Sequence, residues 1–189
     1  MIKIAIFASG TGSNFEALLT AIDEGRLQAK TTLLVCDKTG APVIEKAKAR
    51  VIPTFVFTPK AYGSKAKYEE AILNALKDHH VDWVILAGYM RLIGPVLLTA
   101  YEGRIINIHP SLLPKYKGKD AIERAFSAGE KEIGVSIHYV DAGMDTGEVI
   151  TQEAILLTGK ETLPEVKAKI HQVEHRLYPQ TLECLFKNS

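Results

Sequence analysis

The sequence has few cysteines and no long apolar run, and each absence removes a class of protein. Only Cys36 and Cys184 are present, and two isolated cysteines form neither zinc-site spacing nor a disulfide framework. Cys36 ends the apolar run 32–36, which favours a buried position. No segment approaches the roughly 18 apolar residues of a transmembrane helix, and the N-terminus lacks a signal-peptide cleavage site. We therefore expect a cytoplasmic protein with no membrane partner.

The sequence also lacks an excess of either charge. It carries 23 Lys and Arg against 22 Asp and Glu, which gives a formal net charge of +1 at pH 7. This balance does not favour electrostatic binding to nucleic acid, so no nucleic-acid partner is expected. Hydrophobic residues make up 47% of the 189 residues, enough to bury one sizeable core. Without a visible linker or repeat, residues 1–189 are expected to form a single domain.

Short apolar runs alternate with amphipathic segments up to residue 109. The expected elements are strand 3–8, helix 14–25, strand 31–36, helix 42–50, strand 53–57, helix 65–79, strand 82–87, helix 95–100 and strand 104–109. Such alternation is typical of an α/β fold, in which helices cover both faces of a mostly parallel, twisted sheet.

The pattern changes in the C-terminal part. Residues 134–140 and 148–157 are expected to be strands, and the Gly-rich segment 141–147 favours a hairpin-like, antiparallel connection between them. Residues 162–186 predict a long closing helix. A break is expected at Pro179, because proline removes a helical hydrogen bond.

The first candidate site is the Gly-rich loop 9–14, between the first strand and the first helix. In parallel sheets, ligands bind beyond the carboxyl ends of strands, and a helix N-terminus there suits a phosphate. Phe15 stands where a dinucleotide fingerprint would need its third glycine, and no Lys-Ser/Thr pair follows as in a P-loop. The loop therefore fits a single phosphate. The alternative is a tight turn that ends in Asn14 as the helix cap.

The second candidate site lies at the end of strand 104–109. Asn107 and His109 are separated by one residue, so their side chains leave the same face of the strand. An amide donor beside an imidazole suits oxyanion stabilisation and proton transfer. A strand end with a satisfied polar pair is the alternative. Asp145, in a Gly-rich loop, would favour a charged His109 if the two were close, but it is equally suited to capping its own turn.

A third pattern, His171 to His175, matches the H-x-x-E-H string of one class of zinc peptidase. A catalytic zinc requires a third protein ligand, and Glu183 is the only carboxylate side chain that follows. A solvated or substrate-facing helix end is therefore favoured over a metal site.

The sequence resembles the formyltransferase family that uses 10-formyltetrahydrofolate. The resemblance is carried by the unbroken block 107–114 and by the later pattern from Gly134 through His138 and Asp145 to Gly147, and it covers nearly the whole chain. It implies a Rossmann-like formyltransferase fold. It also implies an enzyme that transfers the formyl group of 10-formyltetrahydrofolate to the amine of glycinamide ribonucleotide, in purine biosynthesis, without a metal.

The resemblance also implies roles for particular residues. The implied catalytic residues are Asn107, His109 and Asp145. The implied substrate-binding residues are Gly12, Ser13 and Asn14 at the phosphate and Glu174 at the glycinamide end. The implied folate-binding residues are Lys65, Met90, Arg91, Leu92, Ile93, Asn107, Val140, Asp141 and Ala142.

Two positions depart from the family pattern. Lys65 stands where relatives often carry arginine, so the charge is kept but the planar bidentate fork is lost. Relatives also carry histidines at the positions of Asp120 and Ile122, so the role of those histidines does not carry over to the loop 117–122.

Three other functions compete with this one. A methionyl-tRNA formyltransferase would carry a further RNA-binding domain, and no basic extension follows here. A formyltetrahydrofolate hydrolase usually carries an N-terminal regulatory domain, whereas here the first strand begins at residue 2. A non-catalytic module for phosphorylated ligands would need the loop 9–14 but not Asn107, His109 and Asp145 together. The sequence leaves the oligomeric state open between a monomer and a homodimer.

Overall fold

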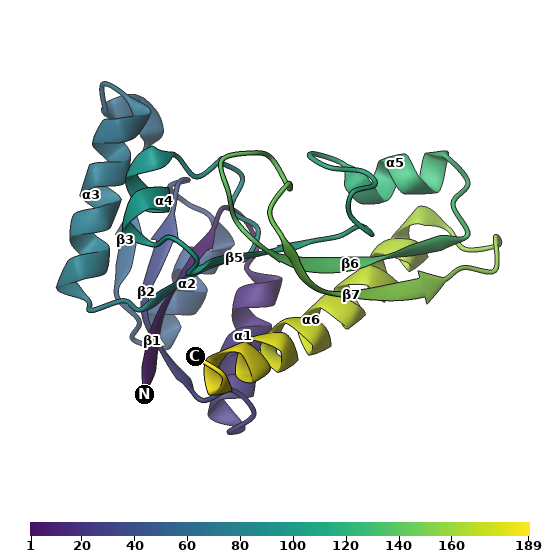
Figure 1. Cartoon of the computed structure of the whole chain (residues 1–189), viewed down its shortest axis with the longest axis horizontal. Coiled ribbons are helices and arrows are strands. Elements are labelled where there is room, and N and C mark those ends of the chain that lie inside the picture. The colour runs from purple at the N-terminus through teal and green to yellow at the C-terminus, as the bar shows by residue number, and fades with distance from the viewer.

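The computed structural model describes residues 1–189 and contains one seven-stranded sheet with helices on both faces (Figure 1). The strands, in spatial order, are β3 (Thr54–Val56), β2 (Ala29–Cys36), β1 (Ile2–Ala8), β4 (Trp83–Leu86), β5 (Ile105–His109), β6 (Glu132–Tyr139) and β7 (Val149–Leu156). Neighbours from β3 to β5 pair in parallel, whereas β6 pairs antiparallel with both β5 and β7. The expected α/β class, with antiparallel strands near the C-terminal part, is confirmed.

The sheet divides the interior into two cores, and helices cover each of them. The helices are α1 (Ser13–Asp23), α2 (Pro42–Ala49), α3 (Lys65–Asp78), α4 (Pro95–Ala100), α5 (Ala121–Ser127) and α6 (Leu163–Lys187). Alternate residues of β1 serve the two cores: Ile4 and Ile6 pack on the side of α1, α2 and α6, and Ala5 and Phe7 pack on the side of α3 and α4. A buried parallel strand therefore needs a continuous apolar run, which is what β1 carries.

The long helix α6 runs without a break through Pro179, so the break expected there is wrong. Residues on both sides of the proline are held by the core: Tyr178 is fully buried, and Leu182 and Phe186 lie in the same apolar cluster. The Tyr178 hydroxyl also donates to the Leu86 and Ile106 carbonyls, at 2.7 and 3.2 Å. Packing along the helix thus outweighs the loss of one backbone hydrogen bond.

A second difference is α5, which the sequence pattern did not predict. It is only 7 residues long, and Asp120 precedes it with a left-handed φ of 55° and no side-chain cap. No proline or capping side chain marks its start, whereas Pro95 marks the start of the 6-residue α4.

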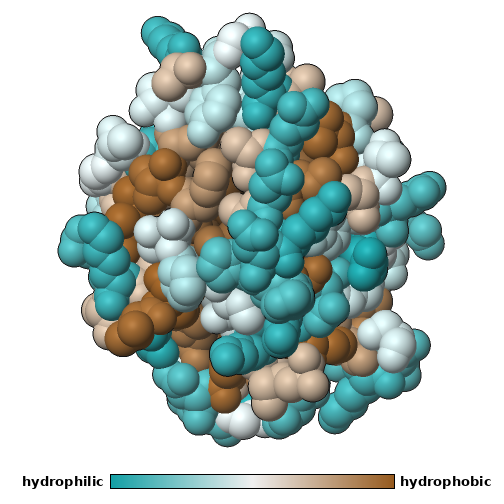
Figure 2. Space-filling view, turned by 90° about the vertical axis from the view of Figure 1, so that its left-hand side faces the viewer, coloured by the Kyte–Doolittle hydropathy of each residue, from teal (hydrophilic) through white to brown (hydrophobic).

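The surface on the α3 side carries hydrophobic patches separated by hydrophilic side chains (Figure 2). The homodimer stays a prediction. None of the helices combines the length and the apolar character needed to span a bilayer.

Candidate active site

A cavity of about 690 Å³ lies at the carboxyl ends of the central strands. Of the residues expected at the site, those that line it are Gly12, Ser13, Asn14, Met90, Arg91, Leu92, Ile93, Asn107, His109, Val140, Asp145 and Glu174. These residues come from six separate segments of the chain, so the fold alone brings them together. A second hollow, of about 540 Å³, is lined by none of them.

Three expected folate-binding residues do not line the cavity. Lys65 begins α3, and its side chain lies beside Gly94, directly after the segment 90–93. The Asp141 carboxylate folds back onto its own loop, where it accepts hydrogen bonds from the Gly143 N–H at 3.0 Å and the Thr146 hydroxyl at 2.5 Å. Ala142 is exposed in the same loop. Contact of these residues with a folate stays a prediction.

Asp145 joins the two polar side chains of β5. Its Oδ2 lies 3.4 Å from His109 Nδ1, and its Oδ1 lies 3.5 Å from Asn107 Nδ2. Asn107 and His109 leave the same face of the strand, as their spacing required. The proximity of Asp145 to His109, which the sequence left open, is thus a feature of the fold.

Both ring nitrogens of His109 face hydrogen-bond acceptors. Nε2 donates to the Tyr116 carbonyl at 2.8 Å, and Nδ1 faces the Asp145 carboxylate. A neutral ring has one N–H and would leave one acceptor facing a lone pair. The imidazolium form, with two N–H groups, matches both partners.

His138 belongs to the pattern that carries the family resemblance, but no role in the site was predicted for it. It lies directly opposite Asn107 in the antiparallel pairing of β5 and β6, and it is 2% exposed. Its Nδ1 donates to the Tyr139 carbonyl at 2.8 Å, so Nε2 is left to accept from Asn107 Nδ2 at 3.2 Å. His138 therefore orients the Asn107 amide. The register between the two strands, which sequence does not display, is what reveals it.

The surroundings of Asp145 favour its ionised form. Burial acts to raise the pKa of Asp145, but the neighbouring His138 ring, the hydrogen bond from the Gly118 N–H and the nearby His109 hold it below the ordinary value. The Gly118 N–H donates to Asp145 Oδ2 at 2.8 Å. The site thus places an ionised carboxylate between the His109 and His138 rings.

Gly12 directly precedes α1 and has a φ of 79°. The last two residues of the Gly-rich segment 9–14 therefore belong to the helix. A Cβ at Gly12 would lie 2.5 Å from Val43 Cγ2, so only glycine fits there. Asn14 lies inside the helix, so the alternative of Asn14 as the cap is wrong. Its buried Oδ1 has no protein partner. Ser13 and Asn14 belong to the first turn, whose backbone N–H groups have no intrahelical acceptor.

A buried carboxylate, Asp37, links this loop to the segment 90–93. The Ser9 hydroxyl donates to Asp37 Oδ1 at 2.5 Å and accepts from the Met90 N–H at 2.9 Å. Asp37 Oδ2 accepts from Arg91 Nε at 2.9 Å, and the Asp37 side chain is 1% exposed. Sequence reasoning missed Asp37, although a carboxylate at the carboxyl end of an apolar strand was a signal for it.

Glu174 reaches the cavity from α6 and is 5% exposed. His171 Nδ1 donates to its Oε1 at 2.7 Å, and this bond raises the pKa of His171. Burial lowers the pKa of His175. The structure forms no group of three or more His, Cys, Asp or Glu side chains placed to hold a metal ion.

Comparison with known proteins gives consistent matches over almost the whole chain. Residues 2–182 match the formyl transferase family. A phosphoribosylglycinamide formyltransferase of Bacillus subtilis (strain 168) is 53% identical over 185 residues, which cover 98% of this chain and 95% of that protein. A crystal structure of glycinamide ribonucleotide transformylase 1 from Geobacillus kaustophilus is 55% identical, with a TM-score of 0.95 and 98% of each chain covered. The phosphoribosylglycinamide formyltransferase from Bacillus halodurans is 52% identical, with a TM-score of 0.94 and with 97% and 94% covered.

Proposed function

The chain belongs to the formyl transferase family, and from that premise we propose that it transfers the formyl group of 10-formyltetrahydrofolate to the amine of glycinamide ribonucleotide. The products are formylglycinamide ribonucleotide and tetrahydrofolate, a step of de novo purine biosynthesis. The observation that carries the proposal is the contact of Asp145 with both Asn107 and His109 inside the cavity. A module that only binds phosphorylated ligands has no need of that arrangement.

The two ends of the cavity suit the two substrates. The substrate phosphate binds at Gly12, Ser13 and Asn14, where the start of α1 offers free N–H groups and a partial positive charge. Glu174 holds the glycinamide end with its amine. The folate lies along the segment 90–93 and the Val140 loop, with the Lys65 side chain beside the end of that segment. The formyl carbon and the amine then meet at Asn107, His109 and Asp145.

The hydrogen-bond distances within the site support one assignment of the donors to the reacting oxygen. As the amine attacks the formyl carbon, the carbonyl oxygen becomes negative and needs donors. His109 Nε2 is engaged at 2.8 Å with the Tyr116 carbonyl, whereas its Nδ1 is 3.4 Å from Asp145. Asn107 Nδ2 likewise has a long contact of 3.5 Å with Asp145. His109 Nδ1 and Asn107 Nδ2 are thus the two groups whose N–H bonds can be shared with an oxyanion.

Asp145 keeps the His109 ring charged and oriented, and it helps to pass a proton from the attacking amine to the folate nitrogen. That nitrogen is a weakly basic aryl amine, so the formyl group is already activated and the chemistry requires no metal. Independence from metal, a cytoplasmic location and a homodimeric state all stay predictions.

The test is a formyl-transfer assay with purified protein, glycinamide ribonucleotide and 10-formyltetrahydrofolate, in the presence of a metal chelator. Acceptor-dependent release of tetrahydrofolate that is lost in His109→Ala supports the proposal. Release without the acceptor indicates a hydrolase instead. If the folded protein binds the ligands but releases no tetrahydrofolate, the proposed transfer is wrong.

A further inference from the structure

The loop 115–120 covers the side of the site where His109 and Asp145 meet, and it is held from outside by Arg124 of α5. Arg124 Nη2 donates to the Lys117 carbonyl at 2.5 Å, and Nε donates to the Lys119 carbonyl at 2.9 Å. A planar guanidinium can bind both carbonyls at once, which a lysine ammonium does less well.

One of these bonds acts on the same peptide group that contacts Asp145. The Lys117 carbonyl and the Gly118 N–H belong to a single planar peptide unit and point in opposite directions. Arg124 binds the carbonyl on one side, and on the other side the N–H donates to Asp145 Oδ2 at 2.8 Å. The guanidinium therefore both orients and polarises this donor.

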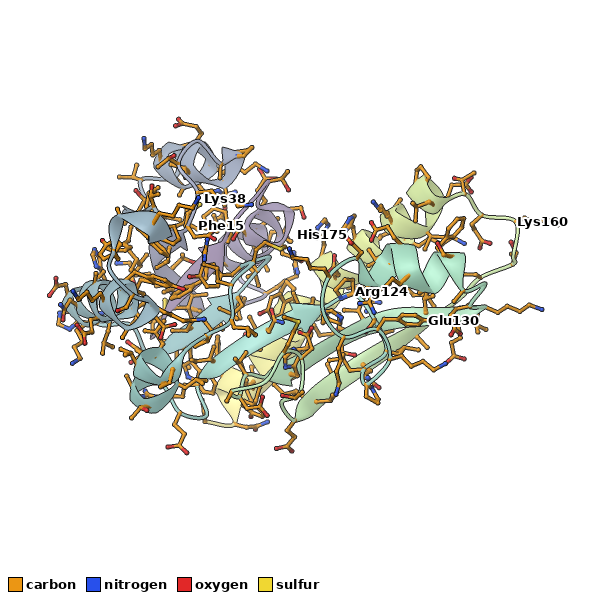
Figure 3. All side chains as sticks on the ribbon, turned by 90° about the horizontal axis from the view of Figure 1, so that it is seen from above. Phe15, Lys38, Arg124, Glu130, Lys160 and His175 are labelled. Atoms are coloured by element: carbon orange, nitrogen blue, oxygen red, sulfur yellow. The ribbon has the colours of Figure 1, made fainter.

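The neighbouring peptide group is fixed in a similar way. The Arg124 guanidinium lies over the Tyr116 ring, 5.7 Å from its centroid, and the Tyr116 hydroxyl donates to Glu130 at 2.8 Å. Arg124 and Glu130 lie close together in the view from above (Figure 3). The Tyr116 carbonyl is the group that accepts from His109 Nε2 at 2.8 Å. The same arginine thus supports one hydrogen-bond partner of each of His109 and Asp145.

The loop needs such support, because its backbone is strained. Tyr116 and Asp120 adopt φ values of 54° and 55°, in the left-handed region that side chains other than glycine disfavour. Arg124 itself does not line the cavity, although Ile122 and Glu123 of the same helix do. Its influence on bound substrates therefore passes through the loop.

We propose that Arg124 is a positioning residue, which clasps the loop 115–120 and thereby holds His109 and Asp145 in the geometry that formyl transfer requires. The inference rests on the proposed function. It assigns a role to the loop 115–120 and to the helix α5 that follows it.

The first experiment compares wild type, Arg124→Ala and Arg124→Lys by kcat, by KM for each substrate, and by the pH dependence of kcat. Arg124→Ala is expected to lower kcat about tenfold, because the reacting groups lose their alignment, with both KM values nearly unchanged. The acid limb of the pH profile should move to higher pH, because Asp145 loses an oriented N–H donor and its pKa rises. The titratable groups that face Asp145 are His109 from β5 and His138 from β6. Arg124→Lys keeps the charge but loses the planar guanidinium that binds both carbonyls, so it should fall in between.

Arg104→Ala is the matched control. The Arg104 guanidinium also lies over a tyrosine ring, 5.5 Å from the Tyr101 centroid, but it precedes β5 and lines no part of the cavity. This variant should keep wild-type kcat and the wild-type pH profile. If Arg104→Ala reproduces the effects of Arg124→Ala, the loss is a general one and the inference is overturned.

A second readout does not depend on activity. Limited digestion with a lysine-specific endoprotease should cut after Lys117 and Lys119 several-fold faster in Arg124→Ala than in wild type or Arg104→Ala. Unchanged cleavage overturns the clasp, and faster cleavage with unchanged kcat overturns its role in catalysis. If the wild-type protein itself transfers no formyl group, the proposed function fails, and the cleavage rates still decide whether Arg124 holds the loop.

Discussion

A substitution of Asn107 tests whether its amide donates to the oxyanion or has only a structural role. Its Nδ2 is anchored on His138 Nε2 at 3.2 Å, and the weaker contact to Asp145 leaves one N–H for the substrate. Removal of a single such donor costs roughly 3–4 kcal/mol of transition-state stabilisation, so Asn107→Ala should lower kcat by about two to three orders of magnitude with little change in KM. Steady-state kinetics measure this, with the exposed Asn74→Ala of α3 as control. Near-wild-type turnover in Asn107→Ala would show that the assigned role is wrong.

The residues that could be predicted from sequence are those whose relation is local. Asn107 and His109 share a strand face, and their spacing alone places them together. His138 and Asp37 depend on which strands are neighbours and in what register: Asn107 meets His138 through the β5–β6 pairing, and Asp37 meets Ser9 because β2 lies beside β1. Periodicity identifies strands but does not order them, so these two members of the site required the structure.

At the scale of elements, Asp37 connects the ends of β1, β2 and the segment after β4. Asp37→Asn keeps the shape but removes the charge that holds Arg91. We expect KM for the folate to rise about tenfold, since the segment 90–93 loses its fixed position, with a smaller change in kcat. The control is Glu45→Gln, which removes the same charge from an exposed pair with Lys48, and such pairs contribute little. A fall in kcat at constant KM would contradict the assignment.

The ends of helices can likewise be predicted where local sequence sets them, but not where tertiary packing does. Helix α4 begins and ends where Pro95 and the apolar pattern predict. The break expected at Pro179 follows correctly from the chemistry of proline, but it is overridden by the packing of Tyr178 and Leu182 on the sheet. Helix α5, which presents Arg124 to the loop 115–120, begins without a proline or a capping side chain, so the sequence does not mark its start.

At the scale of the whole molecule, α6 ties the C-terminal part of the chain to the centre of the sheet. The fully buried Tyr178 donates to the Leu86 carbonyl of β4 and the Ile106 carbonyl of β5, next to Asn107. Burial raises the pKa of Tyr178 well above its ordinary value, so the hydroxyl remains a donor across the working range of pH. The same helix carries Glu174 into the cavity, so the docking of α6 also places the substrate-amine end of the site.

Tyr178→Phe separates stability from catalysis at this junction. The ring still fills the core, but the hydroxyl that joins two strands to the helix is lost, which should lower the free energy of unfolding by about 1–2 kcal/mol. Urea unfolding measures the change, with Tyr62→Phe as control, because the Tyr62 hydroxyl has no hydrogen-bond partner within the chain. Turnover at saturating substrate should stay close to wild type, since Glu174 is still delivered by the packed helix. If stability were unchanged while kcat fell, Tyr178 would act on the site itself, and the docking of α6 would rest on its apolar contacts alone.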